Sequence, residues 1–327
     1  RSDWFSRGNG VETNASVAYD SKNVLSFGAK YIKLTWNTDE NNSSYRRDGN
    51  DARRSFYVEN AWSPDNRTRL TIGIRREDVT QDFRDNDAAT QKTTSKSNAF
   101  DPVLNFTHDI TKHDTIRLSA GRSHVFVGSK DAAGNIRSGY PVPKPERNSS
   151  YELGWKHKFG TKAEFDLTHF RTEVRDRITM VRFGRDRVLE NVDKTHIRGL
   201  ELSYRQTFSP KLSGFANYTW INAKDESTGM TTIASGLPTQ MFNLGVTYRE
   251  GKLRSTLLGR AMRARLDSNG EPTSAGYFAA DLDLHYEPQT DLGLFLRVNN
   301  LFDTDYQYSW GSPADSTNFL LGADMTF

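Results

Sequence analysis

Many stretches of the chain alternate strictly between apolar and polar side chains, and this period of two limits the fold more than any other feature. Residues 276–287, GYFAADLDLHYE, are the clearest case. One parity carries Phe278, Ala280, Leu282, Leu284 and Tyr286, and the other carries Ala279, Asp281, Asp283, His285 and Glu287. Since successive side chains of a β-strand point to opposite faces, this pattern predicts a strand with one apolar face. The same alternation occurs in 68–75, 151–159, 212–220, 241–249 and 291–300, and none of these windows has the helical spacing i, i+3, i+4, i+7.

The connections between these strands alternate in length. Short turns are predicted near 20–23, 63–66, 111–114, 159–162, 209–211, 249–252 and 287–290, and long polar segments near 37–53, 78–98, 126–147, 176–187, 223–238, 266–275 and 302–317. A membrane barrel has this order, because its turns are short on the periplasmic side and its loops are long outside. A soluble β-sandwich, the main alternative fold, has no reason to keep it.

The composition agrees with such a barrel. Only 35% of the 327 residues are hydrophobic, 12% are aromatic, and the mean hydropathy is −0.73. A barrel with an apolar face toward lipid and a polar face toward a wet lumen is expected to be this polar overall. Lys and Arg (44) nearly balance Asp and Glu (41), which argues against a nucleic-acid partner. No run of 18 apolar residues predicts a spanning helix, and the absence of cysteine removes disulfides and thiolate sites.

The predicted number of strands does not fit a complete barrel. The pattern predicts about fifteen, the first near 11–20 and the last at 318–327, and the last follows a long loop. A closed single-chain bacterial barrel has an even number of strands with both ends on the periplasmic side. Either one element is miscounted, or the chain begins part-way round a larger barrel.

Three motifs resemble the TonB-dependent outer-membrane receptors. The first is the NLFD..Y stretch of Asn300, Leu301, Phe302, Asp303 and Tyr306, followed by one loop and a last strand that ends in Phe327. The second places Pro145, Glu146, Tyr151, Glu152, Leu153 and Gly154 where the family carries L.PE....YELG. The third is a strand with Asn191, Ile197, Gly199, Glu201 and Leu202. The resemblance covers mainly residues 100–327, and the first hundred residues match only as strands.

The resemblance implies an all-β fold, a transmembrane antiparallel up-and-down β-barrel of 22 strands preceded by a plug domain. Residues 1–327 would be the C-terminal portion of that barrel, without the plug. The implied function is import of a scarce ligand, a ferric siderophore or similar metal chelate, in the outer membrane of a Gram-negative bacterium. The implied partners are the TonB complex through the missing plug, the barrel assembly machinery, and outer-membrane lipid and lipopolysaccharide. The alternative function is a passive porin of about sixteen strands.

Candidate ligand-binding residues lie in the long segments, where aromatic rings and cations occur together. They are Tyr45, Arg46, Arg47, Arg137, Tyr140, Tyr308 and Trp310. This combination suits anionic, aromatic iron chelates, although an interfacial aromatic girdle and solvated arginines would have the same composition. The C-terminal LLGADMTF resembles the family's assembly signal, with Gly322, then Met325 and Phe327 on one face.

No catalytic, metal or cofactor motif is recognised. The patterns GxSxG, GxGxxG and the P-loop are missing, so an enzyme is not expected. The seven histidines have no metal-ligand spacing, and the acidic stretch 82–90 lacks the glycine and distal glutamate of a calcium loop. We therefore expect no cofactor and no resident metal.

Overall fold

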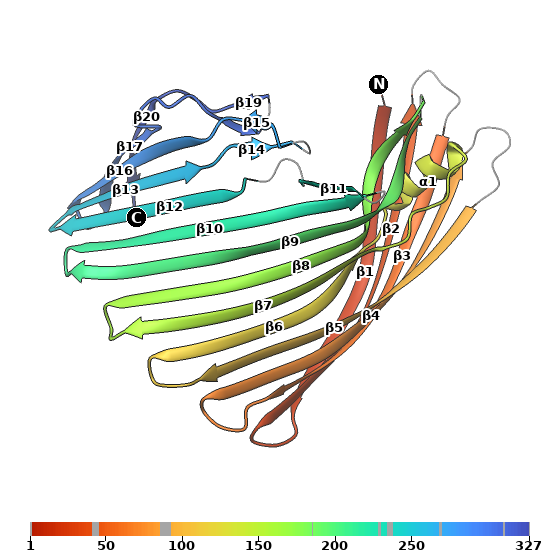
Figure 1. The fold of residues 1–327 in the computed structure, drawn as a ribbon, viewed down its shortest axis with the longest axis horizontal. Coiled ribbons are helices and arrows are strands. Elements are labelled where there is room, and N and C mark those ends of the chain that lie inside the picture. Colours follow the sequence, from red (N-terminus) through yellow and green to blue (C-terminus); the bar gives the residue numbers. More distant parts are fainter. Residues whose placement is uncertain are drawn as a thin grey trace.

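The computed structural model describes residues 2–40, 46–85, 93–184, 186–227, 230–233, 238–267, 270–309 and 311–326. Nearly all of them belong to β-strands, and most of the strands form one long antiparallel sheet that curves strongly (Figure 1). The elements are β1 (Ser2–Ala18), β2 (Asn23–Glu40), β3 (Arg46–Trp62), β4 (Thr68–Asp85), β5 (Thr93–Asp109), β6 (Asp114–Val125), α1 (Ser129–Arg137), β7 (Glu146–Phe159), β8 (Ala163–Phe183), β9 (Asp186–Ser209), β10 (Leu212–Ser227), β11 (Met230–Ile233), β12 (Gln240–Glu250), β13 (Leu253–Met262), β14 (Arg265–Leu266), β15 (Pro272–Ser274), β16 (Tyr277–Gln289), β17 (Leu292–Asn299), β18 (Gln307–Ser309), β19 (Ser312–Pro313) and β20 (Asn318–Met325).

Consecutive strands of the main sheet are hydrogen-bonded neighbours, as an up-and-down barrel requires. Among the described residues the path is β1 to β10, then β12, β13, β16, β17 and β20, while β11 pairs only with β10. This path has the fifteen strands that the sequence pattern predicted. The short pairs β14–β15 and β18–β19 lie outside the main sheet.

The two end strands of the sheet, β1 and β20, do not pair with each other over the residues that the structure describes. β1 pairs with β2 from Ser2 to Ala18, and β20 pairs with β17 from Asn318 to Met325. The sheet is therefore an open, curved wall, and Figure 1 shows its two ends well apart.

The two faces of the wall differ as the alternation predicted. In β16, the apolar Leu282 and Leu284 point to the outer face with Phe278, which is 45% exposed. The inner face carries ion pairs, for example between Arg297 Nε and Asp283 Oδ2 at 3.2 Å and between Lys156 Nζ and Glu164 Oε1 at 2.9 Å. An apolar outer face and a charged inner face suit lipid on one side and water on the other.

The long polar segments differ from the sequence prediction, because several of them continue as strands. Residues 176–187 were expected to form a loop, yet β8 and β9 run through them as one hairpin in which Phe183 pairs with Asp186. β2 to β5 also extend well into 37–53 and 78–98. About 10 residues suffice to cross the hydrocarbon. Beyond that band both faces are wet, so the alternation disappears from the sequence while the hydrogen-bond ladder continues.

The segment 126–147 was also expected to be a loop, and it contains the helix α1. Its nine residues pack against β3, β4 and β9, with Ala132 fully buried. These strands are far apart in the sheet, so a helix that reaches all of them must lie on the concave side. We call this side the inner face. No described helix has the length and apolar character needed to cross a membrane.

Candidate functional site

The inward-folded segment 126–145 is the most distinctive feature of the long-loop end of the wall. β6 stays paired with β7 up to Val125, but its pairing with β5 ends at Gly121 and Val103. The chain then turns inward, and Val127 and Ala132 pack with Phe83 of β4 in an apolar cluster. The indole N–H of Trp36 in β2 donates to the Ser129 hydroxyl. The helix therefore narrows the space enclosed by the wall at this end.

Two asparagines fasten the segment to β9 as short substitutes for strand pairing. Asn135 Nδ2 donates to the carbonyl oxygen of Leu189 at 2.6 Å, and Asn135 Oδ1 accepts from the Leu189 amide at 2.8 Å. Asn191 does the same for Lys144, accepting from its amide at 2.8 Å and donating to its carbonyl oxygen at 3.0 Å. Asn135 is only 2% exposed, so its bonds are shielded from water, whereas those between Asn191 and Lys144 are exposed. The segment is thus held at both its helix and its exit.

Buried polar side chains of β3 and β4, among them Asp51 and Gln81, lie near the start of the inward-folded segment. Gln81 Nε2 donates to the carbonyl oxygen of Val127, and Asp51 is 5% exposed. Arg53 Nη2 lies 3.8 Å from Asp51 Oδ2, and its guanidinium carbon lies 6.0 Å from the centroid of the Phe126 ring. Asp51 Oδ1 and Arg53 Nε have no hydrogen-bond partner in the described part of the chain. Both atoms are buried, so they are unsatisfied polar atoms inside the packed part of the wall rather than an open binding surface.

Most of the predicted ligand-binding residues fall where side chains are not described. Tyr45 and Trp310 lie outside the described residues. The backbones, but not the side chains, of four others are described: Arg46 and Arg47 at the start of β3, Arg137 at the end of α1 and Tyr308 in β18. Because α1 contacts β3, the element that carries Arg46 and Arg47 touches the one that carries Arg137, whereas β18 belongs to the connection before β20.

Tyr140 is the member of this set whose side chain is described. Its ring stacks on Phe183 at the end of β8, with centroids 5.4 Å apart and planes 16° apart. The ring is half-buried, so one face of it is already occupied by protein. Tyr140 therefore lies beside the end of β8, where part of its surface serves packing, and its role in ligand binding stays a prediction.

The C-terminal residues of the predicted assembly signal lie on both faces of β20. Met325 is 62% exposed on the outer face, opposite Leu292. Gly322 is opposite Phe295 on the inner face, where a Cβ would collide with the Phe295 ring. Phe327 lies outside the described residues.

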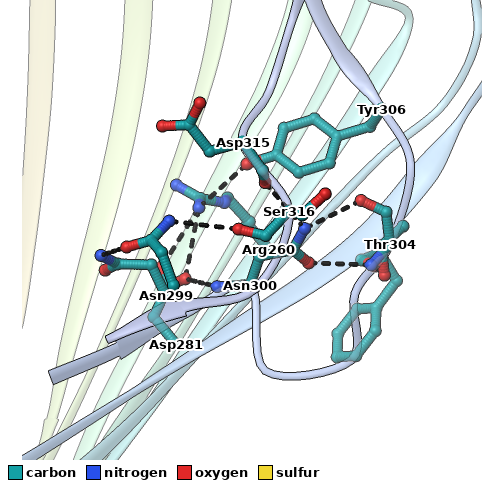
Figure 2. Close-up of polar contacts among 10 residues, drawn as sticks. Arg260, Asp281, Asn299, Asn300, Thr304, Tyr306, Asp315 and Ser316 are labelled. Carbon is teal, nitrogen blue, oxygen red and sulfur yellow. Dashed lines mark hydrogen bonds and ion pairs between the residues drawn. The ribbon is translucent and has the colours of Figure 1, made fainter. Parts of the chain in front are cut away.

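The NLFD..Y motif forms a buried corner between β17 and the following loop (Figure 2). Asn300 is 2% exposed and has φ +51°, a left-handed conformation that asparagine tolerates. Its Nδ2 donates to the carbonyl oxygens of Thr304 (2.9 Å) and Asp315 (3.1 Å), and its Oδ1 accepts from the Thr304 amide at 2.9 Å. Its own amide donates to Asp281 Oδ1 at 2.8 Å. One residue, through its side chain and its own amide, therefore ties β16, β17 and the loop together.

Arg260 and Tyr306 complete this corner, and Figure 2 shows the Arg260 guanidinium in contact with both Asp281 and the Tyr306 hydroxyl. Arg260 Nη2 lies 3.1 Å from Asp281 Oδ2 and donates to the Tyr306 hydroxyl at 3.2 Å. The Tyr306 ring stacks on Tyr277 with centroids 4.2 Å apart. Arg260 was missed at the level of the sequence, because its partners are at least 21 residues away and no local pattern marks it.

The glycines of the other two motifs, Gly154 and Gly199, occupy positions where a larger side chain would collide with its neighbours. A Cβ on Gly154 would lie 2.8 Å from Arg117 Nη2, and that guanidinium crosses β7 to reach Asp166 Oδ1 at 2.6 Å. A Cβ on Gly199 would collide with the carbonyl oxygen of Trp220 and the ring of Phe170. These two glycines thus mark places where the wall is closely packed.

A family model described as TonB dependent receptor-like, beta-barrel matches residues 1–301. Among curated proteins, the chain is 25% identical over 202 residues to the catecholate siderophore receptor Fiu of Escherichia coli K12, a match that covers 56% of this chain and 26% of Fiu. It is 26% identical over 177 residues to the vitamin B12 transporter BtuB of Vibrio vulnificus, covering 54% of this chain and 28% of BtuB. The chain therefore spans about a quarter of the length of these relatives.

Solved structures share the fold over essentially the whole chain. The copper transporter OprC superposes with a TM-score of 0.83 at 18% identity, covering 100% of this chain and 57% of that one. The ferric citrate transporter FecA superposes with a TM-score of 0.82 at 18% identity, covering 99% of this chain and 55% of that one.

Proposed function

Because the chain belongs to the TonB-dependent receptor-like β-barrel family, we propose that the protein of which it is part imports a scarce ligand by plug remodelling coupled to the inner-membrane energy source. Proteins of this family lie in the outer membrane of Gram-negative bacteria, and so does this chain. Its curated relatives carry the names of receptors and transporters. We propose a ferric siderophore or similar metal chelate as the ligand.

The proposal includes a larger barrel. Residues 1–327 would supply about fifteen of 22 strands, and the preceding strands and plug would come from chain before Arg1. The unpaired edges of β1 and β20 support this, since each unsatisfied backbone group costs several kcal/mol in hydrocarbon. The chain also covers little more than half of the solved structures that share its fold.

We propose that the ligand binds next to the inward-folded segment. Asn135 and Asn191 fix it across the concave side of the wall, so a ligand that enters from outside meets α1 before it reaches the lumen. Arg46, Arg47, Arg137 and Tyr140 belong to the elements that meet there, and Tyr308 and Trp310 belong to the loop before β20. Cations and aromatic rings would bind the carboxylates and catechol rings of a chelate.

The relatives' names support a metal chelate without identifying one. Fiu is named a catecholate siderophore receptor, FecA a ferric citrate transporter and OprC a copper transporter. BtuB is named a vitamin B12 transporter, so the names of the relatives also include a ligand of another class.

Equilibrium binding to the full-length protein in detergent tests the ligand class. We expect saturable binding of one metal chelate from a panel of ferric catecholate, ferric citrate, a copper chelate and cobalamin. Replacing Arg46, Arg47 and Arg137 with Ala should weaken that binding at least tenfold, while Arg76→Ala on the outer face leaves it unchanged. If no member binds saturably and the gene begins just before Arg1, the passive porin is the better account.

A further inference from the structure

The half of β5 nearest the long loops has a neighbouring strand on one side only. β5 pairs with β4 from Thr93 to His108, but with β6 only from Val103 to Asp109. The sheet path that the structure describes gives the residues before Val103 no second neighbour. Residues 93–102 therefore form a free sheet edge, which we call the β5 edge. An edge of this kind is a template for pairing with another chain.

The hydrogen-bond pattern shows which backbone groups of the β5 edge are unpaired. The Asp109 amide donates to the carbonyl oxygen of Arg67 at 2.9 Å, so the odd-numbered residues of β5 bond to β4. The even-numbered residues point their N–H and C=O groups to the other side. Pro102 is one of them, and because it has no N–H it cannot continue the ladder to β6. The unpaired N–H groups of the β5 edge belong to Thr94, Lys96, Asn98 and Phe100.

The β5 edge lies mainly outside the hydrocarbon band. About ten residues of a tilted strand cross that band, and counting from Asp109 at the short-turn end of β5 places the outer limit of the band near Phe100. The Phe100 side chain is 53% exposed, as expected at the rim of the apolar face. Thr94, Lys96 and Asn98 are exposed beyond that limit. Their unpaired backbone groups therefore face water and are open to a partner from outside.

The inward-folded segment covers the inner side of the β5 edge. Just after the end of β6, the carbonyl oxygen of Val127 accepts from Gln81 Nε2 on the inner face of β4. Because β5 lies between β4 and β6, the chain crosses the inner side of β5 there, and Ala99 on that side is 4% exposed. His124 Nδ1 lies 2.5 Å from Asp101 Oδ1 and joins β6 to β5 at the base of the gap. The gap beside the β5 edge is therefore a slot with a closed base and a covered inner side.

Three cations border this slot. Lys96 belongs to the β5 edge, and Arg122 and Arg147 belong to β6 and β7. Arg147 is the cross-strand partner of His124, which places it near the base of the slot. Within the described part of the chain, none of the three cations forms an ion pair, because the nearby carboxylates have other partners. Those partners are Arg76 for Asp78, Thr94 for Asp82 and His124 for Asp101.

We infer that the β5 edge binds an extended, acidic peptide segment, which adds to the sheet as one more strand. About six residues of the segment would pair with the unpaired backbone groups between Thr94 and Phe100. Alternate side chains of a strand share a face, so carboxylates at alternate positions would lie beside Lys96 and Arg122. A second copy of this chain is disfavoured as the partner, because it would bring its own Lys96 to the same edge. The inference goes beyond the proposed import function and is independent of the imported ligand.

The test measures binding of a labelled eight-residue peptide, in which glutamate and threonine alternate, to the folded full-length protein in detergent. Fluorescence anisotropy should show saturable binding. Asn98→Pro should weaken it at least tenfold, because proline removes an N–H at the free edge and leaves the ladder to β4 intact. Asn98→Ala keeps that N–H and is the matched control; its affinity should stay within twofold of wild type. Heat-modifiable migration on gels identifies the folded fraction on which binding is measured.

A second peptide, with lysine in place of glutamate, tests the charge of the partner. It should bind wild type at least tenfold more weakly than the acidic peptide, and Lys96→Glu should reduce or reverse that preference. If the acidic peptide does not bind saturably, if Asn98→Pro binds it as well as Asn98→Ala, or if both peptides bind equally well, the inference is overturned. If the wild type is a dimer that Asn98→Pro separates and that the peptide does not, the edge pairs with a second copy and the peptide assignment is wrong.

Discussion

Asn135 pairs with both backbone groups of Leu189, donating to its carbonyl oxygen at 2.6 Å and accepting from its amide at 2.8 Å. The two residues are 54 positions apart, and their contact joins α1 to the first residues of β9. Leu189 pairs with Met180 of β8, but over the described residues the pairing of β9 with β10 ends at Lys194, so the side-chain amide takes the place of the missing second neighbour. The inward-folded segment owes its position to this pairing and to the similar one between Asn191 and Lys144.

Asn135→Ala should release the inward-folded segment without unfolding the wall. It leaves the half-buried amide and carbonyl of Leu189 without these partners, which costs about 2 kcal/mol and corresponds to a roughly thirtyfold rise in local opening. Hydrogen exchange of residues 129–137 and of Leu189 measures this rise. Asn105→Ala is the matched control, since Asn105 accepts only from Ser119 on the wall itself. Unchanged exchange in the Asn135 variant would show that apolar packing alone holds the segment.

Asn300→Ala should destabilise the whole barrel more than the same substitution at the neighbouring Asn299 does. Asn300 makes three side-chain hydrogen bonds in a buried corner, so the loss should reach at least about 3 kcal/mol. In the described part of the chain the Asn299 side chain makes one hydrogen bond, from its Nδ2 to Asn318 Oδ1 at 2.7 Å, and Asn299→Ala should cost under about 1 kcal/mol. Urea unfolding in detergent micelles compares the two variants. Equal losses would mean that the corner is not a stabilising element.

The sequence predicted the strands of the wall far better than it predicted the inward-folded segment on the concave side of the wall. The alternation in 276–287 identified the outer and inner faces of β16 correctly, because a period of two translates directly into two faces. The fifteen-strand path followed from the same pattern. The helix α1 was missed because nine polar-rich residues have little helical tendency by themselves, and their packing partners Phe83 and Trp36 are distant in the chain. Local patterns do not contain such contacts.

Deleting Phe327 should impair assembly more than ligand binding. The deletion removes the aromatic end of the last strand, which we expect to serve as an assembly signal at the lipid interface. The amount of folded barrel in isolated outer membranes should fall, while correctly inserted molecules keep their ligand affinity. Phe327→Tyr, which keeps an aromatic terminus, is the control. Normal insertion of the deletion variant would contradict this prediction.

The turn between β3 and β4 should make a pH-dependent contribution through Asp65. The Arg67 amide donates to Asp65 Oδ1 at 2.8 Å and the Thr68 amide donates to it at 2.7 Å, and these bonds lower the pKa of Asp65 below its ordinary value of 3.8. A lowered folded-state pKa means that the carboxylate stabilises the fold above the unfolded-state pKa and ceases to do so as the pH falls through the folded-state value. Asp65→Asn should therefore be less stable than wild type at pH 7, and the difference should shrink below about pH 4. Unfolding curves at pH 3 and pH 7 check this, and a difference that is the same at both would contradict it.

The central claim is that the protein imports its ligand with energy supplied through TonB, and an uptake measurement tests it most directly. Cells that express the full-length protein, and matched cells that lack TonB, are given the radiolabelled metal chelate that binds best in the panel, and its accumulation is followed over time. We predict saturable accumulation that is lost in cells without TonB, because a plugged barrel opens only when it is coupled to the inner-membrane energy source. Accumulation that continues unchanged without TonB and rises linearly with external concentration would contradict the account and identify a passive channel.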